Sequence, residues 1–158
     1  MKAALPPIIN AESKILILGT MPGEQSIALQ QYYGNRGNHF WKILFTVCDE
    51  PFSNGYNDRK SLLNKHKIAL WNVLASCERE GSSDSAIKNE TANDLDALHA
   101  IYPAITHVFF ESRAAEKFFA KYAKPHKNIT YATLPSTSGL NARLSFAQKL
   151  EAWQAIKL

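Results

Sequence analysis

Four short apolar runs alternate with helical patterns along this chain of 158 residues. The runs cover residues 15–18, 68–73, 107–110 and 129–134, and their length and apolar character predict buried strands. Between them, apolar side chains recur three or four residues apart, which is typical of amphipathic helices. Parallel strands need such crossover connections, so the alternation predicts an α/β fold with a parallel sheet and helices on both faces.

The helices are predicted where this spacing follows a capping residue, and they start near Asn38, Asp58, Leu95, Ser112 and Arg143. Asn38 and Ser112 are suitable N-caps, and Thr91 with Asp94 resembles a capping box ahead of Leu95. The polar, glycine-interrupted segment 76–88 is predicted to be a long loop, and loops of this length in a small domain often carry function.

Length and composition indicate one domain, residues 1–158. Hydrophobic residues make up 46% and charged residues 20% of the chain, as in ordinary globular proteins. The apolar runs are too short to cross a bilayer, and the N-terminal segment lacks the apolar region of a signal peptide, so we expect a cytoplasmic protein. Cys48 and Cys77 are the only cysteines, which argues against a disulfide scaffold or a four-cysteine zinc site.

The charge is compatible with a nucleic acid partner. The net charge is +4 and the pI is near 9.1, and a basic protein gains affinity for a polyanion by releasing condensed counterions. The indication is weak by itself, because lysines such as Lys60 and Lys121 also suit a solvated surface.

Loops that leave the carboxyl ends of parallel strands meet at one edge of the sheet, where α/β proteins bind their ligands. Here these loops begin at Thr20, after Trp71, at Glu111 and at Pro135. The sequence YYGNRGNHFW, residues 32–41, belongs to the connection after the first strand, so we expect it at the same edge.

The residue types in these loops favour a nucleobase as ligand. They contain no P-loop, no dinucleotide fingerprint and no nucleophile elbow, and the five histidines have no zinc-binding spacing. They are rich instead in amides, hydroxyls and aromatic rings. Such groups hold a flat heteroaromatic base by stacking and hydrogen bonds.

Four segments carry a family resemblance: GTMPG from Gly19, YYGNRGNHFWKIL from Tyr32, ALWNVLASCEREGSSDS from Ala69 and LPSTSGLNAR from Leu134. Taken in order, they resemble successive motifs of the uracil-DNA glycosylase superfamily, and most closely its DNA-deoxyinosine (hypoxanthine-DNA) glycosylase branch. The resemblance implies a three-layer α/β/α sandwich with a central four-stranded parallel sheet. It also implies base excision repair by hydrolysis of the N-glycosidic bond of a deaminated base, hypoxanthine or uracil, that is flipped out of DNA. The implied reaction needs no cofactor and no metal, and the implied partner is single- or double-stranded DNA bound by a monomer.

By this resemblance, Asn38 is the catalytic residue. Met21 stands where mismatch-specific uracil glycosylases carry the asparagine that positions water, and in the deoxyinosine branch that role moves to the asparagine before Phe40 and Trp41. Asn38 would align the attacking water or stabilise the cation-like sugar. The residues alone leave open that Asn38 only caps the following helix.

The resemblance also assigns the base pocket. Backbone N–H groups of the turn Thr20, Met21, Pro22 and Gly23 would stabilise the leaving base, as in an oxyanion hole. Tyr33 would lie against the base, although it could also be a surface ring. Glu111, which stands where relatives often have asparagine in Phe-Asn-Gly, could accept a hydrogen bond from a base N–H.

The DNA backbone would be bound by polar residues of three segments, and Leu140 would fill the space of the flipped nucleotide. The residues are Arg36, Ser82, Ser83, Asp84, Ser85, Ser136, Thr137, Ser138, Gly139, Leu140, Asn141 and Arg143. Alternatives stay open for several: Arg36 could lie in solvent, Asp84 could serve the base pocket or cap a turn, and Arg143 could form a surface ion pair. The whole segment 135–142 could also be a turn that caps the final helix.

Two other functions fit the same residues. An α/β domain could hold a nucleotide phosphate at the TMPGEQS turn without chemistry on DNA. Alternatively, Met21 and Glu111 could mark a protein that flips a damaged base and leaves it attached.

Overall fold

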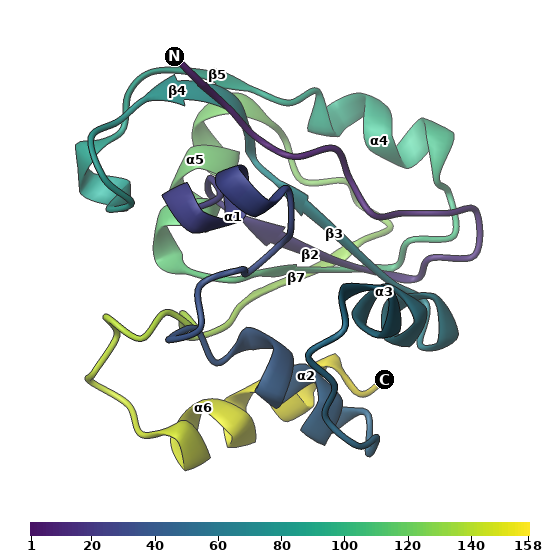
Figure 1. Cartoon of the computed structure of the whole chain (residues 1–158). Helices are drawn as coiled ribbons and strands as arrows, with labels where there is room; N and C mark the ends of the chain where they lie inside the picture. The colour runs from purple at the N-terminus through teal and green to yellow at the C-terminus, as the bar shows by residue number, and fades with distance from the viewer.

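The computed structural model describes residues 1–158, and its centre is a parallel sheet of four strands in the order β3-β2-β6-β7 (Figure 1). The strands are β2 (Ile15–Gly19), β3 (Ile68–Asn72), β6 (His107–Phe110) and β7 (Thr130–Thr133). In the register, Gly19 pairs with Asn72 on one side of β2, and Leu18 pairs with Phe110 on the other. The four strands were all predicted from the sequence, and the predicted α/β/α class is confirmed.

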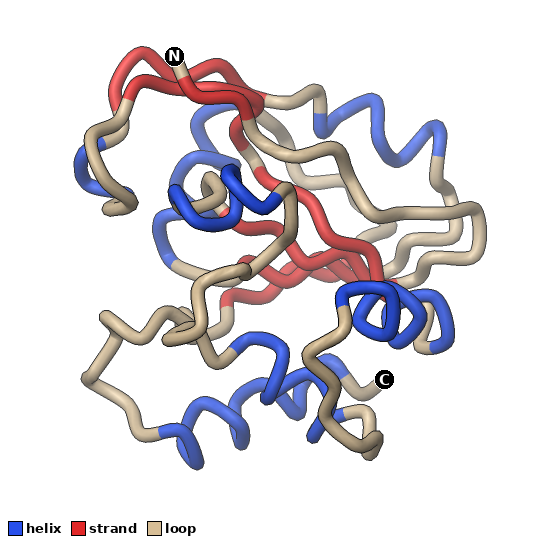
Figure 2. The backbone as a smooth tube through the Cα atoms, viewed as in Figure 1, coloured by secondary structure: helices blue, strands red, loops and turns tan.

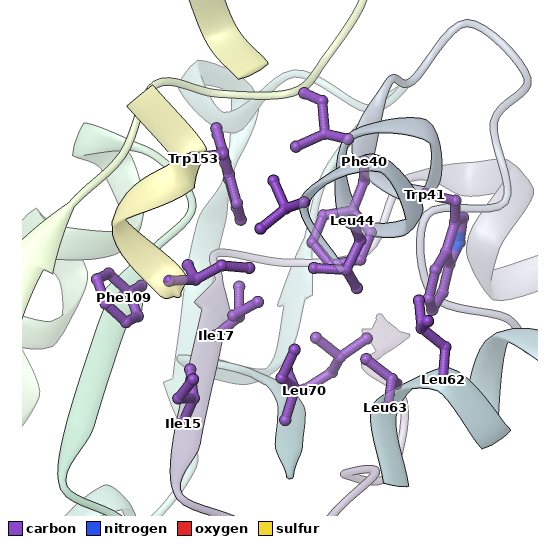
Figure 3. Packing of buried hydrophobic residues seen from close by; sticks show 14 of the residues in the cluster. Ile15, Ile17, Phe40, Trp41, Leu44, Leu62, Leu63, Leu70, Phe109 and Trp153 are labelled. Atoms are coloured by element: carbon purple, nitrogen blue, oxygen red, sulfur yellow. The ribbon is translucent and has the colours of Figure 1, made fainter. Parts of the chain in front are cut away.

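Helices cover both faces of this sheet. Successive residues of each strand point to opposite faces, so both faces carry apolar side chains that need covering. Ile15 and Ile17 belong to the core cluster under α2 (Phe40–Val47), α3 (Tyr56–Lys65) and α6 (Phe146–Trp153). Leu16 and Leu18 belong to the cluster under α4 (Leu95–Ile101) and α5 (Arg113–Tyr122). Figure 3 shows the first cluster, in which Trp153 and Phe40 lie over the strand that carries Ile15 and Ile17.

A second, antiparallel sheet was not predicted. It contains β1 (Lys2–Ala3), β4 (Leu74–Glu78) and β5 (Lys88–Ala92), and Figure 2 shows its strands apart from the parallel sheet. The prediction of one polar loop over 76–88 is therefore wrong at both ends of that segment. Leu74 and Cys77 are fully buried, but the polar residues around them and two irregularities in the β4–β5 register hide the alternation.

Several helix ends differ from the prediction. The short helix α1 (Glu24–Leu29) was missed, and α3 starts two residues earlier than Asp58. Ser112 caps α5 as predicted, by accepting the Ala115 N–H at 3.2 Å. Two 3-10 turns, η1 (Asp84–Ala86) and η2 (Gln154–Ile156), complete the elements.

One capping box and the start of the last helix were assigned wrongly. Asp94 caps α4 by accepting the Ala97 N–H, but Thr91 lies in β5 and takes no part in a capping box. The last helix begins after Ser145, which forms a capping box with Gln148, and Arg143 precedes it. No helix combines the length and the apolar character that a bilayer crossing requires.

Candidate active site

A cavity of about 690 Å3 opens at the carboxyl edge of the parallel sheet. Its size lies within the range of about 300 to 1,000 Å3 that is common for ligand sites. The loops after β2, β6 and β7 meet here with Asn72 at the end of β3 and with the segment that enters α2, as expected from the topology. Residues 82–84, from the connection between β4 and β5, complete the lining. The predicted site residues that line it are Thr20, Met21, Pro22, Gly23, Tyr33, Asn38, Ser82, Ser83, Asp84, Glu111, Ser136, Ser138, Gly139, Leu140 and Asn141.

Asn38 lies on the cavity wall, and a hydrogen bond fixes its carboxamide. Its Oδ1 accepts the Phe40 N–H at 2.9 Å. The helix α2 starts at Phe40 with His39 as N-cap residue, one position later than predicted, but Asn38 supplies the side-chain bond to the first turn. The side chain is half-buried, and its Nδ2–H groups donate to no protein atom. Asn38 therefore caps the helix and still presents free donors to the cavity.

Tyr33 forms an aromatic wall of the cavity. Phe40 covers one face of its ring in a parallel stack, with centroids 3.7 Å apart and planes at 14°. The φ of Tyr33 is +53°, in the left-handed region that costs a side-chain-bearing residue about 1 kcal/mol. Strained residues of this kind gather at functional sites. Burial raises the pKa of Tyr33 well above its ordinary value, so its hydroxyl stays protonated.

The turn after β2 carries free backbone donors. The N–H groups of Met21 and Gly23 donate to no acceptor in the protein, and both residues line the cavity. A buried arginine holds this turn: Arg79 donates to the Pro22 carbonyl, and its Nε donates to the Gly81 carbonyl at 3.1 Å. The Met21 side chain is 7% exposed and belongs to the core.

Asn72 is a cavity residue that was not selected from the sequence. It ends β3 and is 4% exposed, and its Oδ1 is buried without a hydrogen-bond partner. An unpaired buried carbonyl is costly unless a ligand donates to it. The position of an asparagine at the end of a predicted strand was the available signal, because strand ends form the binding edge.

Glu111 ends β6 and is held by the loop that follows β7. Its Oε1 accepts hydrogen bonds from the Thr137 N–H at 3.2 Å, the Thr137 hydroxyl at 3.0 Å and the Ser136 hydroxyl at 3.5 Å. Burial raises the pKa of Glu111 to about 7, and these hydrogen bonds oppose the shift. The carboxyl is therefore partly protonated near neutral pH.

The segment 135–141 forms a tight loop at the mouth of the cavity. Thr137 is fully buried and its hydroxyl donates to Glu111, so the predicted phosphate contact does not fit this residue. Leu140 is 88% exposed, and Asn141 donates to the Ser136 carbonyl at 3.0 Å. The buried Lys149 supports the loop from below by donating to the Ser138 carbonyl at 3.2 Å.

The segment 82–85 forms the opposite lip. The Ser82 hydroxyl accepts the Glu24 N–H at 2.9 Å, and the hydroxyls of Ser83 and Ser85 are 2.8 Å apart. Burial raises the pKa of Asp84, while the nearby Thr20 hydroxyl and Arg79 oppose this shift. Asp84 lines the cavity, which is compatible with a role in the base pocket. It does not cap the turn, because Ser83 is the N-cap residue of η1 and no side chain makes a capping hydrogen bond there.

Four predicted DNA-binding residues do not line the cavity, and one of them is the buried Thr137. Arg36 and Ser85 are exposed on the segments that flank it. Arg143 lines a neighbouring groove with Arg113 and Lys117, and this groove shares Ser136 and Asn141 with the cavity. The structure thus places Arg143 beside the cavity rather than in it.

Another cavity, of about 280 Å3, lies beneath α4 and α5 and is lined mainly by apolar side chains, among them Leu16, Leu18 and Val108. No loop from the carboxyl edge contributes to it. It therefore does not combine the amides and rings that were expected to hold a base.

The fold and the first cavity define an α/β protein with a polar, ring-walled site at the carboxyl edge of a parallel sheet. The chain belongs to the uracil DNA glycosylase superfamily, whose family model matches residues 6–157. This match confirms the resemblance that the motifs indicated.

Individual relatives agree with that membership. The chain is 35% identical to a hypoxanthine DNA glycosylase of Methanosarcina acetivorans over 99% of its own length and 98% of the relative's. It is also 35% identical to a hypoxanthine DNA glycosylase of Methanosarcina barkeri, with 96% and 95% of the two chains covered. A solution NMR structure from Methanosarcina acetivorans, assigned provisionally as a uracil DNA glycosylase, superposes with a TM-score of 0.82 at 34% identity, covering 98% of this chain and 95% of that one.

Proposed function

We propose that this chain, as a single domain of residues 1–158 and a monomer, is a monofunctional DNA glycosylase. It binds DNA, flips a deaminated base into the cavity and hydrolyses its N-glycosidic bond as a step of base excision repair. Family membership and the two hypoxanthine DNA glycosylase relatives support the reaction. The observation that carries the proposal is one cavity that combines Asn38, the Tyr33 ring and Asn72, whose buried amide oxygen has no hydrogen-bond partner.

The base is held by stacking and by hydrogen bonds. Tyr33 offers the ring face that Phe40 leaves uncovered, and stacking of a base on an aromatic ring contributes about 1 to 3 kcal/mol. On binding, the Asn72 amide turns so that its Oδ1, which is buried in this structure, accepts the ring N–H that deamination creates in hypoxanthine and uracil. Adenine and cytosine have a lone pair at that position, so they leave the Asn72 oxygen unpaired.

The bond between C1′ and the base nitrogen breaks through an oxocarbenium-like transition state, and water adds to C1′. Asn38 aligns this water or stabilises the positive sugar with its fixed carboxamide. The free N–H groups of Met21 and Gly23 stabilise the negative charge that develops on the base while the bond breaks. Loss of one such donor typically reduces the rate about 100- to 1000-fold.

The loops around the cavity mouth bind the DNA strand. Leu140 enters the duplex where the nucleotide has left, which offsets part of the few kcal/mol that flipping costs. Phosphates are bound by the hydroxyls, amides and cations that ring the mouth: Arg36, Ser82, Ser83, Ser85, Ser136, Ser138, Asn141 and Arg143.

A panel of duplexes that each carry one damaged base tests the proposal, with strand cleavage at the abasic product as the signal. We expect the wild type to release hypoxanthine or uracil and Asn38→Ala to be at least about 100-fold slower. Asn38→Ser is the matched control, because serine still caps α2 but is too short to replace the carboxamide. Equal loss in both variants with an unchanged melting temperature for Asn38→Ser supports catalysis by Asn38.

Two other outcomes contradict the proposal. Tight binding of damaged duplexes without product would identify a protein that reads the base and leaves it attached. Affinity for free nucleotides equal to that for duplex DNA would identify a nucleotide-binding domain.

A further inference from the structure

The two oxygens of the Glu111 carboxyl group have different surroundings. Oε1 accepts all three hydrogen bonds that Thr137 and Ser136 donate. Oε2 has no hydrogen-bond partner in the protein and is not among the buried, unpaired polar atoms, so it is accessible. Glu111 lines the base cavity, where the accessible oxygen meets a bound ligand. Because Oε1 is occupied as an acceptor, a proton on this carboxyl resides on Oε2.

Glu111 and Asn72 reach the cavity from opposite sides of β2. Asn72 pairs with Gly19 on one side, and Glu111 follows Phe110, the partner of Leu18, on the other. Neighbouring strands are about 4.8 Å apart, so the two residues stand roughly two strand spacings from each other. A single base between them meets Asn72 at one edge and Glu111 at another. When Asn72 takes the N–H edge, Glu111 is left for an edge that carries ring nitrogens with lone pairs.

We propose that Glu111 is a catalytic residue, a general acid that transfers its Oε2 proton to a ring nitrogen of the departing purine. This inference rests on the proposed glycosylase function. The bond between C1′ and N9 breaks with its electron pair going to the purine, and the proton from Glu111 reaches N7 or N3, so that the base leaves neutral. Water forms the new bond to C1′, and the proton that it loses restores the acid.

The charges around Glu111 keep the acid form available near neutral pH. Burial and the Asp84 carboxyl raise the pKa of Glu111 to about 7, against the hydrogen bonds from Thr137 and Ser136. The Tyr33 hydroxyl near it stays neutral because the pKa of Tyr33 is raised. The buried Lys149, which donates to the Ser138 carbonyl, interacts with Glu111 and favours its ionised form. DNA phosphates at the cavity mouth add negative charge, which favours the protonated acid.

This role predicts a preference for purine lesions. Hypoxanthine has N3 and N7 lone pairs that accept a proton, whereas the free ring nitrogen of uracil already carries hydrogen. Uracil therefore gains less from the Glu111 proton and is expected to leave more slowly. A positioned general acid typically contributes about 100- to 10,000-fold to a rate.

The test is the single-turnover rate of hypoxanthine release between pH 5 and 9 for wild type, Glu111→Gln and Glu151→Gln. The wild-type rate is expected to fall about tenfold for each unit above pH 7, because the acid form is lost as the pH passes its pKa. In Glu111→Gln, the amide oxygen keeps the Thr137 and Ser136 donors, and the NH2 group takes the place of Oε2. This variant can donate a hydrogen bond but cannot release a proton, so its rate is expected to be at least about 100-fold lower at pH 6 and independent of pH. Glu151 is an exposed carboxylate of α6, and its replacement serves as the control.

DNA binding by Glu111→Gln shows whether the substitution affects catalysis or the structure of the site. Duplexes that contain 2′-fluoro-deoxyinosine resist cleavage, and Glu111→Gln is expected to bind them within about threefold of wild type. A pH-independent wild-type rate, or a Glu111→Gln rate within about threefold of wild type, overturns the role of Glu111 while the glycosylase function stands. If the wild type releases no base at any pH, both proposals fail.

Discussion

Gly139 lies directly against the backbone of Gly37. A Cβ atom at Gly139 would stand 2.6 Å from the Gly37 carbonyl oxygen, a distance that side-chain carbons do not adopt. The two glycines are 102 residues apart in sequence, and a hydrogen bond from the His39 N–H to the Thr137 carbonyl, at 3.0 Å, joins the same two segments. The loop with Leu140 and the loop with Asn38 therefore form one rim, and the glycines allow their contact.

Gly139→Ala is expected to separate these two loops. The added methyl group clashes with backbone, so the loop that carries Leu140 must shift. We expect duplex affinity and hydrolysis rate each to fall about tenfold or more, with a melting temperature close to that of wild type, since the loop is on the surface. Gly55→Ala is the control, because its Cβ meets only side-chain atoms, of Asp58 at 3.1 Å and of Ser53 at 3.5 Å, and none of these residues lines the cavity. Unchanged affinity in Gly139→Ala would show that the contact has no role in holding the rim.

The parallel sheet was predictable because its strands are buried on both sides. Leu16 and Ile17 face opposite layers, yet both are at most 2% exposed, so the run reads as continuously apolar. The second sheet was not predictable in this way. Its strand β5, Lys88–Ala92, has no buried residue and reads as a polar loop.

The residues of the site that belong to recognisable motifs could be predicted from the sequence. Asn38 and Tyr33 lie in a segment whose composition is unusual, and the topology brings that segment to the binding edge. The contacts that hold the cavity loops in place could not be predicted from the sequence, because they join residues that are distant along the chain. Arg79 reads as part of a polar loop but is buried against the Pro22 carbonyl, and Thr137 reads as a phosphate ligand but donates to Glu111.

Leu140→Ala is expected to slow base release from duplex DNA without affecting the fold. The side chain is 88% exposed, so its truncation removes little buried area. A wedge matters only where a stacked and paired nucleotide must be replaced. We expect hypoxanthine release to fall about tenfold or more from a duplex and less than about threefold from a single strand. Equal losses on the two substrates would contradict a wedge role.

The free energy of unfolding is expected to fall as the pH rises, because Glu111 is buried in the folded protein. The pKa of Glu111 is raised to about 7 in the folded protein from an ordinary value of 4.5, so between these values the folded state binds more protons than the unfolded state. Stability then falls with increasing pH across this window, by an amount on the order of 3 kcal/mol for this group. Glu111→Gln removes the titration. Urea unfolding at pH 5 and pH 8 should show a smaller change in the free energy of unfolding for the variant than for the wild type. An equal change in both proteins would contradict the raised pKa of Glu111.

Arg79 is expected to be the residue that joins the turn after β2 to the lip of the cavity. Its side chain is fully buried, it donates to the carbonyls of Pro22 and Gly81, and its Nη1 lies 3.9 Å from the Asp84 carboxylate. Arg79→Met leaves the buried Pro22 carbonyl without a donor, whereas Gly81 and the Asp84 carboxylate can be solvated. We expect a loss of about 1 to 3 kcal/mol in the free energy of unfolding, as for other buried acceptors that lose a donor.

Arg79→Lys distinguishes the effect of the positive charge from that of the planar guanidinium group. Lysine keeps the positive charge beside Asp84, but it cannot reach two carbonyls with a planar fork. We expect most of the stability to return while hydrolysis stays slow, because the Met21 and Gly23 N–H groups lie in the turn that Arg79 holds. The measurements are urea unfolding and single-turnover release of hypoxanthine at pH 6. Wild-type rates in Arg79→Lys would show that the turn keeps its position without the guanidinium, and that β2 and β3 alone orient its donors.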